Sequence, residues 1–291
     1  MRKALVAVII LLLVGLGVWF ALWQAEETPP PIPAPVIEDE NPKYEVIGQS
    51  VKGRPIETFS YGQGDTNLLF VGGVHGGYEW NSVLLAYKFI DYLNENPSII
   101  PQNVSVTVIP ALNPDGVYAV TGKSGRFSVE DVATDEDVLA SGRFNAREVD
   151  LNRNFACKWQ PKSRWQGREV SAGAEAFSEP EAVALKNFVL EHKPEAVVFW
   201  HSKANAVYAS ECKEGILPET LEIMNSYAKA ASYQAVESFD SYPITGDAEG
   251  WLASINVPAI TVELKTHETI EWTQNLAGIR ALFDYYASPI D

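Results

Sequence analysis

Short apolar runs with few charges recur along the chain and are separated by polar or amphipathic segments. Runs of this length that are rich in β-branched residues indicate buried strands. These runs are NLLFVGG (67–73), VSVTVIPAL (104–112), AVVFWHS (196–202) and PAITVEL (258–264). YEVIGQS (44–50) and RPIETFSYG (54–62), which flank VKG, are typical of a hairpin.

Other segments have the periodicity of helices. Large apolar residues recur every three or four positions over 79–94, which predicts an amphipathic helix. The segment 178–193 opens with Ser178 and Glu181 in a capping-box pattern, so a helix is expected to begin there. A further amphipathic helix is expected over 275–288.

This alternation of strands and helices predicts an α/β fold with a mixed, mostly parallel central sheet and helices on both faces. Ligands of such sheets bind outside the carboxyl ends of the strands. Polar residues stand at or just after these predicted strand ends: His75, Asn113, His201 and Glu263. The polar, weakly periodic segments 121–142 and 156–177 are expected to be long loops near the same site.

The N-terminal region has the sequence pattern of a membrane segment, unlike the globular part of the chain. Arg2 and Lys3 precede an uncharged apolar run from Ala4 to Trp23, which has the length of a bilayer-spanning helix. We expect a signal anchor over residues 1–25, with the remainder outside the cytoplasm. A cleaved signal peptide, followed by secretion, is the alternative. A proline-rich linker is expected over 26–43 and one globular domain over 44–291.

The net charge and the cysteines indicate which partners and which compartment suit the protein. The formal net charge of −16 argues against a nucleic-acid partner, because few basic residues are available to neutralise phosphates. The two cysteines of the chain are Cys157 and Cys212. Export to an oxidising compartment favours a disulfide between them, and two independent buried thiols are the alternative.

The chain has four histidines, and two of them stand out. His75 and His201 each follow an apolar strand, and Glu79 lies close to His75 in the sequence. Zinc accepts two histidines and a carboxylate in catalytic sites, with a further position left for water. His192 at a helix end and His267 in a polar segment are interpreted as ordinary surface or core residues.

A second polar group lies in REVDLNRNFAC, residues 147–157. Asn152, Arg153 and Asn154 are flanked there by Leu151 and Phe155. An arginine fork matches the geometry of a carboxylate, so a substrate carboxylate is one interpretation. An ordinary loop held by ion pairs is the other.

Taken together, these motifs resemble those of the zinc carboxypeptidase family, the carboxypeptidase A-like metallopeptidases. The resemblance rests on GGVHGGYE (72–79), NPDG (113–116), GRFNAREVDLNRNF (142–155), FWHS (199–202), YPITGDAEGW (242–251) and ITVEL (260–264). They occur in the family's order and are spread over most of residues 67–264.

The resemblance implies a zinc-dependent metallocarboxypeptidase with one zinc ion per chain. His75, Glu79 and His201 would be the metal ligands. Glu263 would be the general base that activates water, and Arg143 would stabilise the oxyanion. Arg147 stands close enough in the sequence to compete for the role of Arg143.

The resemblance also assigns residues to the substrate. Asn152 and Arg153 would hold the terminal carboxylate of a peptide, and Tyr242 would close over it. Glu249 lies near the pocket for the released side chain, where a carboxylate favours lysine, arginine or diaminopimelate. Asp247 is a second acid with the same potential, and both acids could instead face solvent or make structural contacts. A peptide with a free C-terminus, including a cell-wall peptide, is the expected partner.

Two positions differ from the family's usual pattern. The first motif commonly has two residues between its histidine and glutamate, whereas Gly76, Gly77 and Tyr78 stand between them here. The glycines could absorb the additional residue, or Glu79 could fail to reach the metal. Glu148 replaces a glycine that many relatives have. Two other functions therefore stay open: an aspartoacylase-like deacylase of N-acyl amino acids, and an inactive module that binds peptides.

Overall fold

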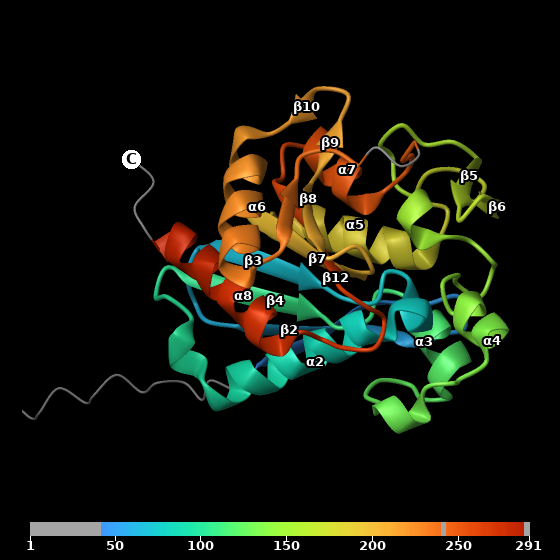
Figure 1. The fold of residues 1–291 in the computed structure, drawn as a ribbon, viewed down its shortest axis with the longest axis horizontal. Coiled ribbons are helices and arrows are strands. Elements are labelled where there is room, and N and C mark those ends of the chain that lie inside the picture. The colour runs from blue at the N-terminus through green and yellow to red at the C-terminus, as the bar shows by residue number, and fades with distance from the viewer. Residues whose placement is uncertain (1–41, 240–242, 288–291) are drawn as a thin grey trace, which may run out of the picture. The chain divides into compact units, whose positions relative to one another are not determined.

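The computed structural model describes residues 42–239 and 243–287 of the chain. In this part, eight strands form one sheet in the order β1-β2-β4-β3-β7-β12-β8-β11 (Figure 1). The strands are β1 (Lys43–Gln49), β2 (Pro55–Tyr61), β3 (Thr66–Val71), β4 (Val104–Ile109), β7 (Ala196–Ser202), β8 (Ala206–Ala209), β11 (Gln234–Val236) and β12 (Ala259–Leu264). Smaller two-stranded sheets pair β5 (Lys162–Trp165) with β6 (Arg168–Ser171) and β9 (Glu211–Cys212) with β10 (Gly215–Ile216).

The central strands β4, β3, β7 and β12 are parallel to one another. The predicted hairpin is present, because β1 and β2 pair in antiparallel fashion. Strands β2 and β4 are also antiparallel, as are β12 and β8. The predicted fold class, a mixed and mostly parallel sheet covered by helices, is therefore confirmed.

The helices of the described residues cover both faces of the sheet. They are α2 (Trp80–Glu95), α3 (Pro114–Thr121), α4 (Glu136–Ser141), α5 (Pro180–His192), α6 (Pro218–Ala231), α7 (Ala248–Ser254) and α8 (Trp272–Ala287). Short 3-10 turns are η1 (Gly76–Glu79), η2 (Pro97–Ile99), η3 (Val129–Asp131) and η4 (Leu151–Arg153).

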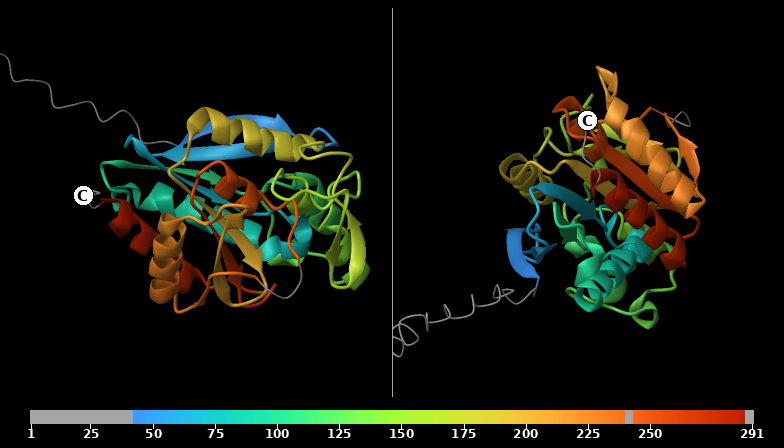
Figure 2. Two further views of the ribbon diagram at one scale, coloured as in Figure 1. Left: turned by 90° about the horizontal axis from the view of Figure 1, so that it is seen from above. Right: turned by 90° about the vertical axis from the view of Figure 1, so that its left-hand side faces the viewer.

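Each central strand supplies side chains to two apolar cores, because successive residues of a strand point to opposite faces. Leu68 and Phe70 of β3 pack in the core under α2, α6 and α8. Leu69 and Val71 of the same strand pack in the core under α5 and α7. Figure 2 shows α2 and α5 on opposite sides of the sheet. Burial on both faces explains why these strands are almost continuously apolar in the sequence.

The predicted capping box at the start of α5 is wrong. The helix begins at Pro180, and its N-cap residue makes no side-chain capping bond. Ser178 Oγ instead contacts Glu179 Oε1 at 2.9 Å. The carboxylate of Glu181 accepts hydrogen bonds from Val51 N at 3.0 Å and from Asn145 Nδ2 at 3.2 Å. Long-range partners thus replace the local cap.

The carboxyl ends of β3, β4, β7 and β12 meet at one edge of the sheet, since these strands are parallel. The expected loop 121–142 lies between α3 and η4 and contains η3 and α4. The expected loop 156–177 instead folds into the β5–β6 hairpin. Its strands are short and polar, so their pairing left little trace in the hydrophobic pattern.

Among the described residues, no helix is long and apolar enough to span a bilayer. The signal anchor expected over 1–25 lies outside these residues, as does almost all of the linker expected over 26–43.

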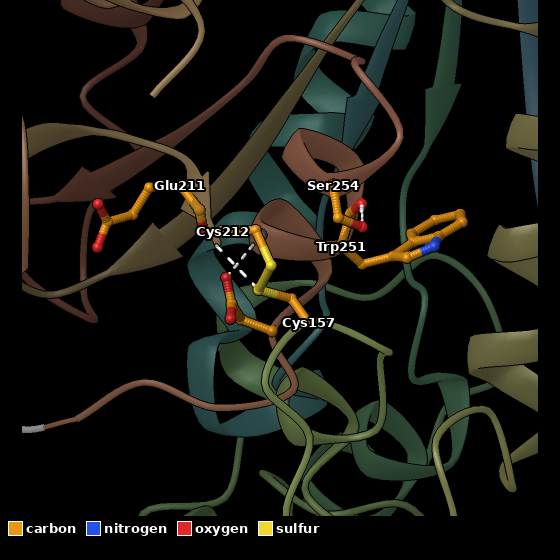
Figure 3. The surroundings of a disulfide bond; sticks show 7 residues. Cys157, Glu211, Cys212, Trp251 and Ser254 are labelled. Carbon is orange, nitrogen blue, oxygen red and sulfur yellow. Dashed lines mark hydrogen bonds between the residues drawn. A yellow bond between two sulfur atoms is a disulfide. The ribbon is translucent and has the colours of Figure 1, made fainter. Parts of the chain in front are cut away.

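Cys157 and Cys212 form a disulfide across 55 residues, which confirms the predicted pairing (Figure 3). Cys157 lies shortly after η4, and Cys212 lies in β9. Gly246 N donates a hydrogen bond to Cys157 O at 2.7 Å, so the segment before α7 is held at the same point. The disulfide therefore fixes two loops beside the carboxyl edge of the sheet.

Reduction of this disulfide is expected to lower the melting temperature. Closing a loop of about 55 residues restricts the unfolded chain and stabilises the folded state by about 4 kcal/mol. Thermal melts with and without reductant measure the effect. The double variant Cys157→Ala/Cys212→Ala should melt lower than the oxidised protein and should be insensitive to reductant. Alkylation of the unreduced, denatured protein should add no mass, whereas modified thiols would contradict the bond.

Candidate metal centre and active-site cleft

A cleft of about 910 Å³ opens at the carboxyl edge of the sheet. Eight of the residues that the sequence predicts for the site line it: His75, Glu79, Arg143, Asn152, Arg153, His201, Glu249 and Glu263. Tyr242 lies outside the described residues. The cleft is lined by a residue that follows β3, by residues of β7, β8 and β12, and by residues of η4, the β5–β6 hairpin and α7.

Three buried side chains form a candidate metal centre. Ligand atoms of His75, Glu79 and His201 all lie within 4.8 Å of one another. His201 Nδ1 is 2.9 Å from Glu79 Oε2. His75 Nδ1 is buried without a hydrogen-bond partner, although Asp150 Oδ1 is 3.5 Å away. A buried nitrogen without a partner is costly, and nitrogen and carboxylate donors in this number suit zinc.

The glycines after His75 allow Glu79 to reach this cluster. Gly76 has φ +47°, and η1 folds the extra residue into a single tight turn. A Cβ atom at Gly76 would lie 2.5 Å from Gly142 O, and one at Gly77 would lie 2.5 Å from the Val120 side chain. Only glycine fits both positions. The turn brings the carboxylate back to the histidine and places Tyr78 in the cleft wall.

The two histidines differ in their electrostatic surroundings. Burial, followed by the positive charge of Arg143, holds the pKa of His75 well below its usual value, so the ring is neutral. Burial opposes the charged form of His201 as well, but the carboxylates of Glu79 and Glu249 outweigh it and raise the pKa of His201 well above its usual value. A cation held by these side chains would take the place of that proton.

Glu263 stands beside His201 in the sheet, since the two residues are register partners in β12 and β7. Its Oε2 atom is buried and has no hydrogen-bond partner among the described residues. Burial, together with the negative charge of Glu79, raises the pKa of Glu263 to about 8. This carboxyl group is therefore able to exchange a proton near neutral pH.

Arg143 is held in place by Asp150, a residue that the sequence prediction missed. Arg143 Nε and Nη2 each lie 3.0 Å from Asp150 Oδ2. Arg143 Nη1 lies 3.8 Å from Glu79 Oε1, and the guanidinium packs over Trp165. Asp150 is fully buried, and a charged residue between Val149 and Leu151 was the signal that could have revealed it. Arg147 is more exposed and pairs with Glu179 at 3.4 Å.

Asn152 and Arg153 lie on η4 beside the N-terminus of α7. Asn152 Oδ1 accepts a hydrogen bond from Ala248 N at 2.8 Å. Arg153 Nη1 donates to Asn152 O at 2.6 Å, while its Nε is buried without a partner. Asp247 caps α7 by accepting from Gly250 N at 2.7 Å, and burial raises the pKa of Asp247 to about 6. Asp247 thus has a structural contact.

Glu249 lies on the other side of His201 from Glu79. Its Oε1 atom is 3.2 Å from His201 Nε2 and accepts a hydrogen bond from Thr261 Oγ1 at 3.2 Å. Burial acts to raise the pKa of Glu249, but the hydrogen bond and charge of His201 prevail and lower it. A buried, ionised carboxylate therefore faces the cleft beside the candidate metal centre.

Tyr78, Trp165 and His267 form an aromatic wall in the lining of the cleft. The Tyr78 ring lies 5.0 Å from that of Trp165 and 4.8 Å from that of His267. Tyr78 Oη accepts a hydrogen bond from Gln166 Nε2 at 3.0 Å. Sequence reasoning treated His267 as ordinary, and that interpretation missed its place in the cleft. His192 does lie at a helix end, with its ring stacked on Phe188.

Comparison with known proteins shows the family. The family model of the zinc carboxypeptidases matches residues 38–285. The chain is therefore a member of this family. Human carboxypeptidase Z is 33% identical over 122 residues, which cover 38% of this chain and 17% of that protein. The match therefore spans less than a fifth of that relative. Zinc is the metal of the family, and the donors of the three-residue cluster fit it.

Solved structures share the fold. The thrombin activatable fibrinolysis inhibitor has a TM-score of 0.67 and 17% identity, over 86% of this chain and 70% of that chain. The murein-tripeptide amidase MpaA from Escherichia coli O157 has a TM-score of 0.58 and 22% identity, over 85% of this chain and 93% of that chain.

Glu263→Gln is expected to stabilise the metal-free protein at pH 8 but not at pH 5. The pKa of Glu263 is raised to about 8, so the folded protein keeps a proton that the unfolded protein releases near its ordinary pKa. The folded state then binds more protons, and the free energy of unfolding falls as the pH rises between these values. A neutral glutamine removes this loss.

Urea unfolding with a chelator present, at several pH values from 5 to 8, measures the difference. The exposed neighbour variant Glu268→Gln is the control and should follow the wild type. Parallel stability curves for wild type and Glu263→Gln would contradict the raised pKa of Glu263.

Proposed function

We propose that this zinc carboxypeptidase family member hydrolyses the last peptide bond of peptides that have a free C-terminus. The observation that carries the proposal is the convergence of three metal-binding side chains, an unpartnered carboxyl group and two buried arginines in one cleft. A site that only binds peptides has no need of a titratable base beside the metal.

His75, Glu79 and His201 are the proposed metal ligands. Their burial and short separations support this assignment, as does the unpartnered Nδ1 of His75. Bound zinc would act as a Lewis acid that lowers the pKa of water and polarises a carbonyl group. The three side chains line the cleft, so substrate in the cleft would have access to the bound ion.

Glu263 is the proposed general base. Its place beside His201, a proposed metal ligand, in the strand register supports this role. The carboxylate takes a proton from the attacking water and later delivers it to the leaving amine. Its lack of a hydrogen-bond partner leaves it available for this transfer.

Arg143 is the proposed donor to the oxyanion. Its bonds to Asp150 hold the guanidinium in one orientation before substrate arrives. Preorganised donors of this kind stabilise developing negative charge without reorganisation. Asp150 is therefore proposed as a positioning residue for Arg143.

Asn152 and Arg153 are proposed to bind the terminal carboxylate of the substrate. Arg153 Nε is buried without a partner, which leaves a donor for such a ligand. Tyr242 is proposed to close over the substrate, although it lies outside the described residues. Binding of the terminal carboxylate restricts cleavage to the last residue of a peptide.

Glu249 is proposed to select a released residue with a cationic or amino-bearing side chain, such as lysine, arginine or diaminopimelate. Its burial and its place on the cleft wall support this role. Asp247 is less suited, because it caps α7. MpaA, whose name includes murein tripeptide, has the same fold, and this adds cell-wall peptides to the proposed substrates.

The proposed setting is extracytoplasmic. The disulfide fits an oxidising compartment. Residues 1–25 are proposed to anchor the chain in the membrane, residues 26–43 to form a spacer, and residues 44–291 to form the catalytic domain.

The proposed reaction is tested with the purified full chain, loaded with zinc and incubated with a mixed peptide pool. Half of the peptides carry a free C-terminus and half a C-terminal amide. Mass spectrometry should show loss of single residues from the free-ended peptides alone, and a chelator should abolish it. Glu263→Gln should retain zinc and lose about 100- to 10,000-fold in turnover, as expected for a missing general base. His201→Ala should lose zinc as well.

Wild-type turnover by Glu263→Gln would overturn the mechanism. Cleavage of acylated amino acids without cleavage of peptides would favour the deacylase. Zinc-loaded protein that binds peptides but cleaves nothing would identify a binding module.

Glu249→Gln is expected to weaken the preference for a C-terminal lysine over leucine. Loss of one hydrogen bond between charged groups corresponds to about a tenfold change or more in kcat/KM for the lysine peptide. The control is Glu211→Gln, which changes an exposed acid on the same cleft wall. An unchanged preference in Glu249→Gln would remove the proposed selectivity.

A further inference from the structure

His267 lies on the segment between β12 and α8 and lines the cleft. Its Nδ1 atom is 2.7 Å from Ser202 Oγ. Either atom of this pair could supply the hydrogen, so the tautomer of the ring depends on the other bonds of Ser202. Those bonds lead to Asn81, which is fully buried.

The orientation of Asn81 is fixed by two carbonyl groups. Asn81 Nδ2 lies 2.6 Å from Thr266 O and 2.9 Å from Thr269 O. Carbonyl oxygens only accept hydrogen bonds, so the amide nitrogen must face them. The amide oxygen therefore faces the other way, toward Ser202.

The orientation of the Asn81 amide determines which atoms donate in the hydrogen bonds of Ser202 and His267. Ser202 Oγ is 3.0 Å from Asn81 Oδ1 and must donate its single hydrogen to that acceptor. The hydroxyl group has no hydrogen left for His267, so it accepts from His267 Nδ1. The proton of the neutral imidazole ring is thereby placed on Nδ1, and Nε2 carries a lone pair.

His267 Nε2 has no hydrogen-bond partner among the described residues. The atom is not fully buried, so a ligand in the cleft can reach it. It points away from Ser202, because the two ring nitrogens project in nearly opposite directions. Burial lowers the pKa of His267, which supports a neutral ring near pH 7. The cleft thus contains an acceptor whose direction the protein fixes.

The position of this acceptor relative to the proposed substrate follows from His201. The Nε2 atom of His201 faces Glu249, on the side proposed for the released residue, and its Nδ1 atom faces Glu79. Tyr78 directly precedes Glu79 in the chain and contacts the ring of His267. His267 is therefore connected through Tyr78 to the Glu79 side of His201, whereas the proposed pocket for the released residue is on its Glu249 side.

We propose that His267 is a substrate-positioning residue, whose Nε2 atom accepts a hydrogen bond from a backbone N–H on the acyl side of the scissile bond. The proposal rests on the proposed peptidase function. A peptide presents N–H donors along its backbone whatever its side chains, so this contact orients the chain rather than reading its sequence. The Ser202–Asn81 bonds keep the acceptor from becoming a donor.

The tautomer is tested without any turnover. The full chain is labelled with ¹⁵N-histidine, and long-range ¹H–¹⁵N correlation spectra distinguish the two neutral tautomers. The chain has four histidines, and His267→Phe identifies the relevant signals. The expected result is the form protonated at Nδ1, in both zinc-loaded and zinc-free protein. A ring protonated at Nε2 would overturn the proposal.

The substrate contact is tested with peptides in which single upstream amides are replaced by esters. Each ester removes one N–H donor and leaves the scissile bond unchanged. At one position, the wild type should lose about tenfold in kcat/KM, as expected for a hydrogen bond left unmade. His267→Phe keeps a ring against Tyr78 and should cleave the ester and amide forms equally well. His267→Gln restores an acceptor and should recover part of the difference.

The matched control is His192→Phe, which changes a histidine stacked on Phe188 at the end of α5. It should retain the wild-type ratio of ester to amide cleavage. Equal ratios for wild type and His267→Phe at every position would refute the contact while leaving the peptidase function intact. A wild type that cleaves no peptide would instead refute the proposed function, and the tautomer would still be measured.

Discussion

One imidazole ring connects the two halves of the cleft. His201 contacts Glu79 through Nδ1 at 2.9 Å and Glu249 through Nε2 at 3.2 Å. Its backbone is paired in parallel register with that of Glu263. A shift in the end of β7 would therefore disturb the candidate metal centre, the neighbouring carboxyl group and the pocket wall together. The buried parallel strands on either side of β7 prevent such a shift, because both faces are packed.

The charges around this ring argue for a bound cation independently of any family likeness. Glu79, Glu249 and Glu263 converge on His201, whereas Arg143 is largely committed to Asp150. An excess of buried carboxylates is costly unless positive charge compensates it. Protonation of His201 and Glu263 is one form of compensation, which their raised pKa values reflect. A divalent cation is the other, and it would free both groups to lose their protons.

The sequence predicted the strands and their polar ends well, because buried parallel strands leave long apolar runs that stop where the site begins. It failed where distant partners decide the outcome. Ser178 and Glu181 match a local cap but bind residues from other parts of the chain. The β5–β6 hairpin has no alternation to reveal it. His267 stands alone in a polar segment, and its role depends on Ser202 and Asn81, which no spacing pattern connects to it.

The additional residue in the first motif shows how local and distant constraints combine. Gly76 adopts φ +47° in a tight turn, and a Cβ atom at Gly76 or Gly77 would collide with neighbouring groups, so both positions require glycine. The residue that remains, Tyr78, is then projected into the cleft, where it packs between Trp165 and His267. Its contact with Trp165 joins the first motif to the β5–β6 hairpin, and its contact with His267 joins it to the segment after β12. The longer spacing therefore keeps Glu79 within the candidate metal centre and at the same time places Tyr78 in the cleft lining. A change in the length of this turn would alter both, so the spacing of the first motif determines the candidate metal centre and the aromatic wall together.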